Sequence, residues 1–96
     1  MSTKDAYKQK MEAELELAQA KLAEWKAEAK SSTADVRIKY DRQIDSLERD
    51  IDATKIKLRE LGESGEDAWE ELKDGVESAW DRVAAAFKDA TAKLKS

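Results

Sequence analysis

Apolar and small residues recur every three or four positions from Tyr7 to Leu61, and charged residues fill most of the positions between them. This spacing is that of one face of an α-helix. The larger side chains on this face, which we call the apolar seam, are Met11, Leu15, Leu22, Trp25, Val36, Tyr40, Ile44, Leu47, Ile51, Leu58 and Leu61. Consecutive steps of four unwind a coiled-coil supercoil locally. The sequence therefore predicts a nearly straight helical rod over about residues 4–61.

The weak point of this rod is the segment 31–34, where the seam carries only Ser or Thr. Ser32 followed by Asp35 fits an N-terminal capping box, which would start a new helix here. Against a turn, the apolar spacing keeps its phase across the segment, and neither Gly nor Pro is present to reverse the chain. We expect one continuous helix, with a turn at residues 30–34 as the alternative.

A second segment does carry helix terminators. Gly62 directly follows Leu61, and Gly65 comes three residues later. A glycine just past the last apolar residue is typical of a helix C-terminus. The sequence therefore predicts a turn at residues 62–65. After this turn a second apolar stripe begins, and its larger members are Trp69, Leu72, Val76, Trp80, Val83 and Phe87.

This second stripe lies in a predicted helix, residues 66–94, that repeats every eleven residues. EDAWEELKDGV (66–76) aligns with ESAWDRVAAAF (77–87). Eleven residues are close to three helical turns, so Trp69 and Trp80 fall on nearly the same face. Gly75 lies inside this helix, where glycine costs about 1 kcal/mol relative to Ala. Because its counterpart one repeat later is the small Ala86, we expect close packing of another helix at this level.

The preferred fold is all-α, a coiled-coil hairpin in which the shorter helix folds back on the longer one. At 1.5 Å per residue the two helices would reach roughly 85 Å and 43 Å, so the shorter one covers only about half of the seam. Met11, Leu15, Leu22 and Trp25 would then face water, and such a stripe normally marks an interface. We therefore expect an antiparallel homodimer. A three-helix bundle with a turn at residues 30–34 is the alternative, because it buries the same stripe within one chain.

Composition agrees with a single helical domain over residues 1–96. Charged residues make up 42% of the chain, Pro is absent and Gly occurs three times, as is typical of long helices. The chain has neither Cys nor His, which excludes disulfides, thiolate chemistry and imidazole catalysis. The paired carboxylates lack the apolar surroundings that acid catalysis needs. We expect no enzyme activity, no cofactor, no metal site and no small-molecule substrate.

The net charge of −4 is unevenly distributed. Acids dominate residues 62–81 and bases dominate residues 82–96, an arrangement that complements the dipole of the last helix. No basic face is available to neutralise phosphates, so nucleic acid is not an expected partner. No apolar run suits a signal peptide or a membrane span, and the expected location is the cytoplasm. Binding of the tryptophans to a membrane surface is a weaker alternative to core packing, because the polar face near them is acidic.

Three segments resemble a group of small bacterial coiled-coil proteins that are loosely linked to stress responses. They are KDAYKQKMEAELELAQAKLAEWKAEA (4–29), KYDRQIDSLERDIDATKIKLREL (39–61) and ESGEDAWEELKDGVESAWDRVAAAF (63–87). Only the spacing from DAW to SAW is specific. The resemblance implies a helical cytoplasmic protein without known catalysis. The group commonly has Ala and Lys where this chain has Ser31, Ser32 and Thr33.

Two functions follow as expectations. The first is a non-enzymatic structural, scaffold or protein-interaction protein that self-associates through the apolar seam. The second is a stress-related protein that binds lipid surfaces or protects other molecules, because eleven-residue repeats also occur in exchangeable lipid-binding and desiccation-protectant helices. Circular dichroism without lipid separates the two, since only the first requires a cooperatively folded helical state.

Overall fold

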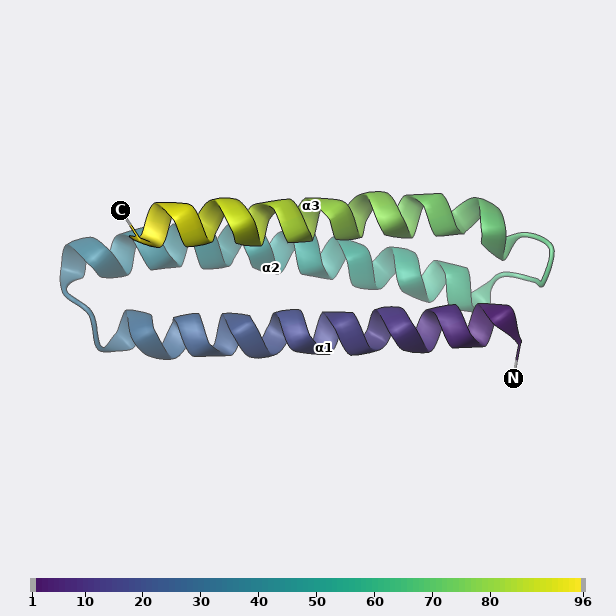
Figure 1. Ribbon diagram of the computed structural model, residues 1–96, viewed down its shortest axis with the longest axis horizontal. Coiled ribbons are helices and arrows are strands. Elements are labelled where there is room, and N and C mark those ends of the chain that lie inside the picture. The colour runs from purple at the N-terminus through teal and green to yellow at the C-terminus, as the bar shows by residue number, and fades with distance from the viewer. Residues whose placement is uncertain (1, 96) are drawn as a thin grey trace.

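The chain folds into three α-helices of similar length. This computed structural model describes residues 2–95, in which α1 spans Thr3–Lys30, α2 spans Ala34–Glu63 and α3 spans Trp69–Lys95. The chain runs along α1, back along α2 and forward again along α3, so that α1 and α3 are parallel (Figure 1). No strand occurs within the described residues. The all-α prediction is confirmed, and the arrangement is the three-helix alternative. Residues 1 and 96 of the predicted domain lie outside the described residues.

The predicted continuous helix over residues 4–61 is wrong, because the chain turns at residues 31–33. The hydroxyls of Ser31 and Ser32 both donate to the carbonyl of Glu28, at 3.1 and 2.7 Å. Their backbone N–H groups also donate to carbonyls in the last turn of α1, each at 3.2 Å. Hydroxyls that bond to nearby backbone satisfy the free carbonyls of a helix end and compete with continuation of the helix. The turn therefore needs neither Gly nor Pro.

The second helix begins without the predicted capping box. Its N-cap is Thr33, which has extended backbone (φ −64°, ψ 163°) and makes no side-chain capping hydrogen bond. Ser32 cannot cap α2 through the pairing expected with Asp35, because its hydroxyl already serves the carboxyl end of α1. The two serines thus end one helix instead of starting the next one.

Polar contacts hold α2 against α1 close to this turn. The Tyr40 hydroxyl donates to a carboxylate oxygen of Glu28 at 2.8 Å. This hydrogen bond is the main reason that the pKa of Tyr40 is raised. Farther from the turn, Lys26 and Glu48 form an ion pair across the two helices. Both of these side chains are largely exposed, so the ion pair contributes at most about 1 kcal/mol.

The second turn, residues 64–68, overlaps only the end of the predicted turn at residues 62–65, because Gly62 does not end the helix. α2 continues past Gly62, and no glycine among the described residues has a positive φ. The terminator is Ser64, whose N–H and hydroxyl both donate to the carbonyl of Leu61, at 3.2 and 2.6 Å. Gly65 lies in the loop that follows, and its carbonyl accepts from the N–H of Trp69 at 3.3 Å. α3 starts at Trp69, three residues later than predicted.

The carboxyl end of α2 is stabilised by lysines from α1. α2 has no basic residue in its own last turn. Lys4 supplies a positive charge there, since its ammonium donates to the carbonyl of Ser64 at 2.8 Å. The side chain of Lys8 lies against Gly62, where an added Cβ would come within 3.1 Å of the lysine Cε. Cations near a helix C-terminus are favourable because of the helix dipole.

One core runs along the whole bundle, which measures 51 × 19 × 16 Å. All three helices contribute buried side chains to it. The members are Met11, Leu15, Ala18, Leu22, Trp25, Ile44, Leu47, Ile51, Leu58, Leu61, Trp69, Val76, Val83 and Ala90. The residues of α1 that a hairpin would leave exposed are therefore buried within the same chain. A dimer through the seam is not needed to bury these residues, because the seam is already covered within one chain.

Candidate functional site

The structure places most of the predicted seam and stripe residues in or beside the core. Twelve of them are buried side chains of the core described above, and four more, Tyr40, Leu72, Trp80 and Phe87, are partly buried and pack against it. Val36 is different, because its side chain is 41% exposed. It lies near the start of α2, only three residues after the turn. The turn moves Val36 away from the face that a continuous helix would have given it.

Gly75 does not mark the close approach of another helix. A Cβ added at Gly75 would meet only the ammonium of Lys57, at 3.9 Å, which is ordinary van der Waals contact. The neighbour at this level is thus the end of one flexible side chain. The predicted close packing at Gly75 is wrong, and the glycine is not required by the space around it.

Two pairs of aromatic side chains join α1 and α3. The ring of Trp25 lies 5.3 Å from that of Phe87, between centroids, and the ring of Tyr7 lies 6.0 Å from that of Trp69. Both pairs are tilted, an arrangement that aromatic rings favour. Both pairs also join residues that are 62 positions apart in the sequence. A residue of α1 therefore lies beside the residue of α3 whose number is higher by about 62.

Tyr7 is the most unusual polar group between these two helices. Its hydroxyl oxygen is buried and has no hydrogen-bond partner among the described residues. Burial is the main reason that the pKa of Tyr7 is raised to about 12, and the negative charges of Glu77, Glu14 and Asp74 add to the effect. The Glu77 carboxylate also raises the pKa as a nearby acceptor, although it does not meet the hydroxyl at full hydrogen-bond geometry. The ammonium of Lys73 lies 5.2 Å from the centroid of the Tyr7 ring, a cation–π contact that favours the cation in this position.

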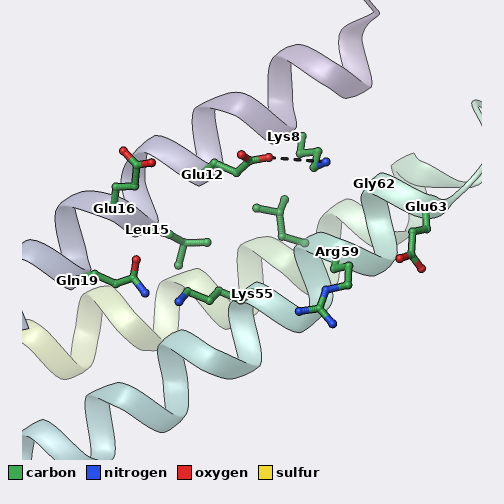
Figure 2. Close-up of a pocket in the computed structure, with 10 residues that line it drawn as sticks. Lys8, Glu12, Leu15, Glu16, Gln19, Lys55, Arg59, Gly62 and Glu63 are labelled. Atoms are coloured by element: carbon green, nitrogen blue, oxygen red, sulfur yellow. Dashed lines mark ion pairs between the residues drawn. The ribbon is translucent and has the colours of Figure 1, made fainter.

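A charged depression lies between α1 and α2, with a volume of about 440 Å³. Figure 2 shows Lys8 and Glu12 paired along α1, with Lys55 and Arg59 reaching out from α2 on the opposite side. The Lys8 to Glu12 pair measures 3.8 Å and is exposed, so it is weak. Leu15 forms part of the floor. Charged side chains of both signs around an apolar floor describe the solvated rim of a helix pair.

A more apolar groove of about 480 Å³ lies between α1 and α3. Its lining residues are Glu14, Leu17, Ala18 and Lys21 from α1, and Trp80, Phe87, Lys88 and Thr91 from α3. Leu17 is 72% exposed, the highest value for a large apolar side chain among those described. Beside it, Trp80 and Phe87 are only partly buried. This groove is the surface where apolar side chains from two helices meet water together.

Sequence reasoning did not single out Leu17, although a signal was present. Leu17 lies two positions after Leu15 and so falls outside the spacing of the seam. Ile38 and Ile56 also lie outside it, and both are about half exposed, at 52% and 53%. Leu17 has aromatic side chains of another helix next to it, Trp80 and Phe87 of α3. That neighbourhood depends on how α3 packs against α1, which the spacing within one helix does not specify.

Comparison with known proteins gave no match to a protein-family model, a curated protein or a solved structure. Within the part of the chain that the structure describes, none of the helices combines the length and apolar character needed to cross a membrane. In the same part, no group of three or more acidic, His or Cys side chains is arranged to hold a metal ion.

Proposed function

We propose that the protein is a non-enzymatic interaction protein, a preformed helical bundle that binds another helix in the groove between α1 and α3. The observation that carries this proposal is the exposure of Leu17 beside Trp80 and Phe87. Covering a leucine of this kind contributes about 1.5 to 3 kcal/mol relative to leaving it in water. An amphipathic helix is the occupant that suits an elongated apolar groove between two parallel helices.

The proposal of a non-enzymatic protein rests on the residues that the chain provides. The absence of His and Cys removes the commonest general bases, nucleophiles and metal ligands. The depression between α1 and α2 collects charges of both signs, with Lys8 paired to Glu12 along α1 and with Lys55 and Arg59 projecting from α2. Tyr7, whose pKa is raised to about 12, is partly buried against Trp69 and stays protonated at neutral pH. These features support structural roles for the charged residues.

A test of helix binding uses the isotope-labelled protein and a designed amphipathic peptide. The peptide carries one leucine stripe flanked by Lys and Glu, and a matched control peptide has Gln in place of each Leu. We expect amide shift changes around Leu17, Trp80 and Phe87 with the first peptide only. The Leu17→Lys variant should lose this response. Shift changes around the charged depression between α1 and α2, or none at all, would contradict the proposal.

A second candidate function is binding to lipid surfaces, in keeping with the resemblance to stress-linked proteins. The eleven-residue repeat of α3 favours it, because such repeats place equivalent groups along one line of a helix. In the bundle, however, most of the apolar stripe of α3 is occupied, since Trp69, Val76 and Val83 are at most 5% exposed and Trp80 is partly buried against the core. Lipid binding would require the bundle to open.

Circular dichroism and tryptophan emission separate the two functions. For an interaction protein we expect strong helicity, a cooperative thermal transition and emission from buried indoles in the absence of lipid. Adding anionic vesicles should change none of these signals. Little helix without lipid, followed by helix formation and a blue shift on addition of vesicles, would favour the lipid-surface function.

A further inference from the structure

The pattern of charges around Leu17 has an internal symmetry. Along the exposed face of α1 the order is Lys10, Glu14, Leu17, Lys21, Glu24. Lys10, Leu17 and Glu24 are each separated by seven residues, close to two helical turns, and Glu14 and Lys21 are separated by the same interval. The five residues therefore form one stripe. Lys10 and Glu24 lie seven residues before and after Leu17, and Glu14 and Lys21 lie three residues before and four residues after it. Each charge on one side of Leu17 therefore has an opposite charge at a similar distance on the other side.

This stripe is complementary to itself when it is reversed. If two copies of α1 cross antiparallel at Leu17, Lys10 of one copy faces Glu24 of the other, about 10.5 Å from the centre on both helices. Glu14 faces Lys21 with a mismatch of about 1.5 Å, which a lysine side chain can span. In a parallel arrangement each charged residue would instead face the same residue of the other copy, which carries the same charge. Charge alone therefore selects the antiparallel orientation.

The second helix of the groove contributes one complementary pair and one pair of like charges. Along the bundle axis, Leu17 of α1 lies at the height of Ala79 of α3, because neighbouring residues of the two helices differ by about 62 in sequence number. Lys88, which lines the groove, lies nine residues beyond that level, and Glu70 lies nine residues before it. Eighteen residues are five full turns, so Glu70 and Lys88 share one face of α3. A two-fold axis at this level brings each Glu70 opposite the Lys88 of the other copy, and each Glu77 opposite an Asp81 on the same face. The selection of the antiparallel orientation by charge therefore rests on α1.

Shape on this face agrees with the charges. A two-fold interface uses the same patch on both partners, so that patch must hold both the protruding group and the hollow that receives it. Here Leu17 protrudes with 72% of its surface exposed, and the hollow formed by Ala18, Trp80 and Phe87 lies directly beside it. Each copy can insert its Leu17 into the hollow of the other.

We propose that the helix bound in this groove is α1 of a second copy, forming an antiparallel two-fold dimer centred on Leu17. The proposal rests on the proposed function and names its partner. It differs from a dimer through the apolar seam, because every contact here uses the surface of an intact bundle. The apolar part of the patch is small, and interfaces of limited area are typically transient. We therefore expect a dissociation constant of about 10 to 100 µM.

Sedimentation velocity over a concentration series tests the proposal. We expect the wild-type protein to pass from monomer to dimer in this concentration range at low salt. Leu17→Lys should remove the dimer, because it places a charge in the apolar hollow. The matched control is Ile56→Lys on α2, since Ile56 is also exposed and lies outside the groove. This variant should associate as the wild type does.

Charge exchange tests the orientation. Glu14→Lys or Lys21→Glu alone should weaken association about tenfold, because two-fold symmetry repeats the lost pair. The double exchange Glu14→Lys with Lys21→Glu should restore it, since the pair re-forms with reversed signs. A protein that stays monomeric at all concentrations, an unaffected Leu17→Lys variant or a double exchange without rescue would each overturn the proposal. Circular dichroism of the same samples distinguishes failure of the dimer proposal from failure of the proposed function. A monomer that unfolds cooperatively would overturn only the second copy as the partner. A protein without stable helix would overturn the proposed function as well.

Discussion

Tyr7 combines favourable and unfavourable interactions in one side chain. Its ring packs on Trp69 and lies under the Lys73 ammonium, whereas its buried hydroxyl has no hydrogen-bond partner among the described residues. Such a buried, unpaired group costs about 1 to 3 kcal/mol in lost hydration. The ring thus stabilises the contact between α1 and α3, and the hydroxyl opposes it.

We predict that Tyr7→Phe stabilises the protein by about 1 kcal/mol at neutral pH, because it keeps the ring and removes the unpaired hydroxyl. The advantage should grow in alkali. The folded-state pKa of Tyr7 is raised from 10.0 to about 12, so the contribution of the neutral tyrosine is complete below pH 10 and is lost as pH rises towards 12. Urea denaturation of both proteins across this range measures the difference. A destabilised Tyr7→Phe variant at neutral pH would show that the hydroxyl has a partner.

Gly75 gives a second prediction for a single residue. The added methyl group of Gly75→Ala meets no atom closer than the Lys57 ammonium at 3.9 Å. The gain in helix propensity should therefore be fully expressed, raising the free energy of unfolding by about 1 kcal/mol. Gly62→Ala is the matched control in α2, where the side chain of Lys8 must move to admit the methyl group. A smaller gain at Gly62 is expected in urea denaturation, and a loss at Gly75 would contradict the account.

Single-residue burial is the part of the structure that the sequence predicts best. Leu47, Val76 and Val83 were assigned to the apolar face by spacing alone, and each is at most 1% exposed. Spacing within a helix specifies which side chains share a face. It does not specify what packs beside that face, so the meeting of Leu17 with aromatic residues of α3 could not be predicted.

At the scale of elements, the turn at residues 31–33 decides the architecture. Helix propensity and apolar phase both permitted a continuous helix, and the sequence lacked the usual breakers. The two serines end α1 with their own hydroxyls, and Tyr40 ties the start of α2 back to Glu28. The serine bonds are local to the end of α1, whereas the Tyr40 bond forms only after the chain has reversed. The chain reversal that they produce together could not be predicted from any one of these residues.

Replacing Ser31, Ser32 and Thr33 by Ala should favour the continuous helix, because Ala has the highest helix propensity and cannot bond to the carbonyls of α1. We predict a domain-swapped dimer, in which α1 of each copy packs on α2 and α3 of the other copy. Sedimentation velocity should show a dimer that persists on dilution. Adding Leu17→Lys should not dissolve it, since the exchanged core does not use the groove. A monomeric triple variant of unchanged stability would contradict this role of the serines.

For the molecule as a whole, the central claim is that one chain covers its own apolar seam. The three helices have 28, 30 and 27 residues, so each can cover the full length of the others. The similar lengths are what allow the bundle to close without a partner. Contacts with another molecule are then left to the outer surface, where the groove at Leu17 lies.

The distance between α1 and α2 tests this claim most directly. Because the sequence has no cysteine, spin labels can be placed with Glu16→Cys and Arg59→Cys, two positions on opposite rims of the same depression. The doubly labelled protein is diluted into excess unlabelled protein, so that pulsed electron paramagnetic resonance reports only distances within one chain. Neighbouring helix axes lie 8 to 10 Å apart, so we predict a label separation of about 20 Å. A separation of about 65 Å, the length of a continuous helix between the two positions, would contradict the account.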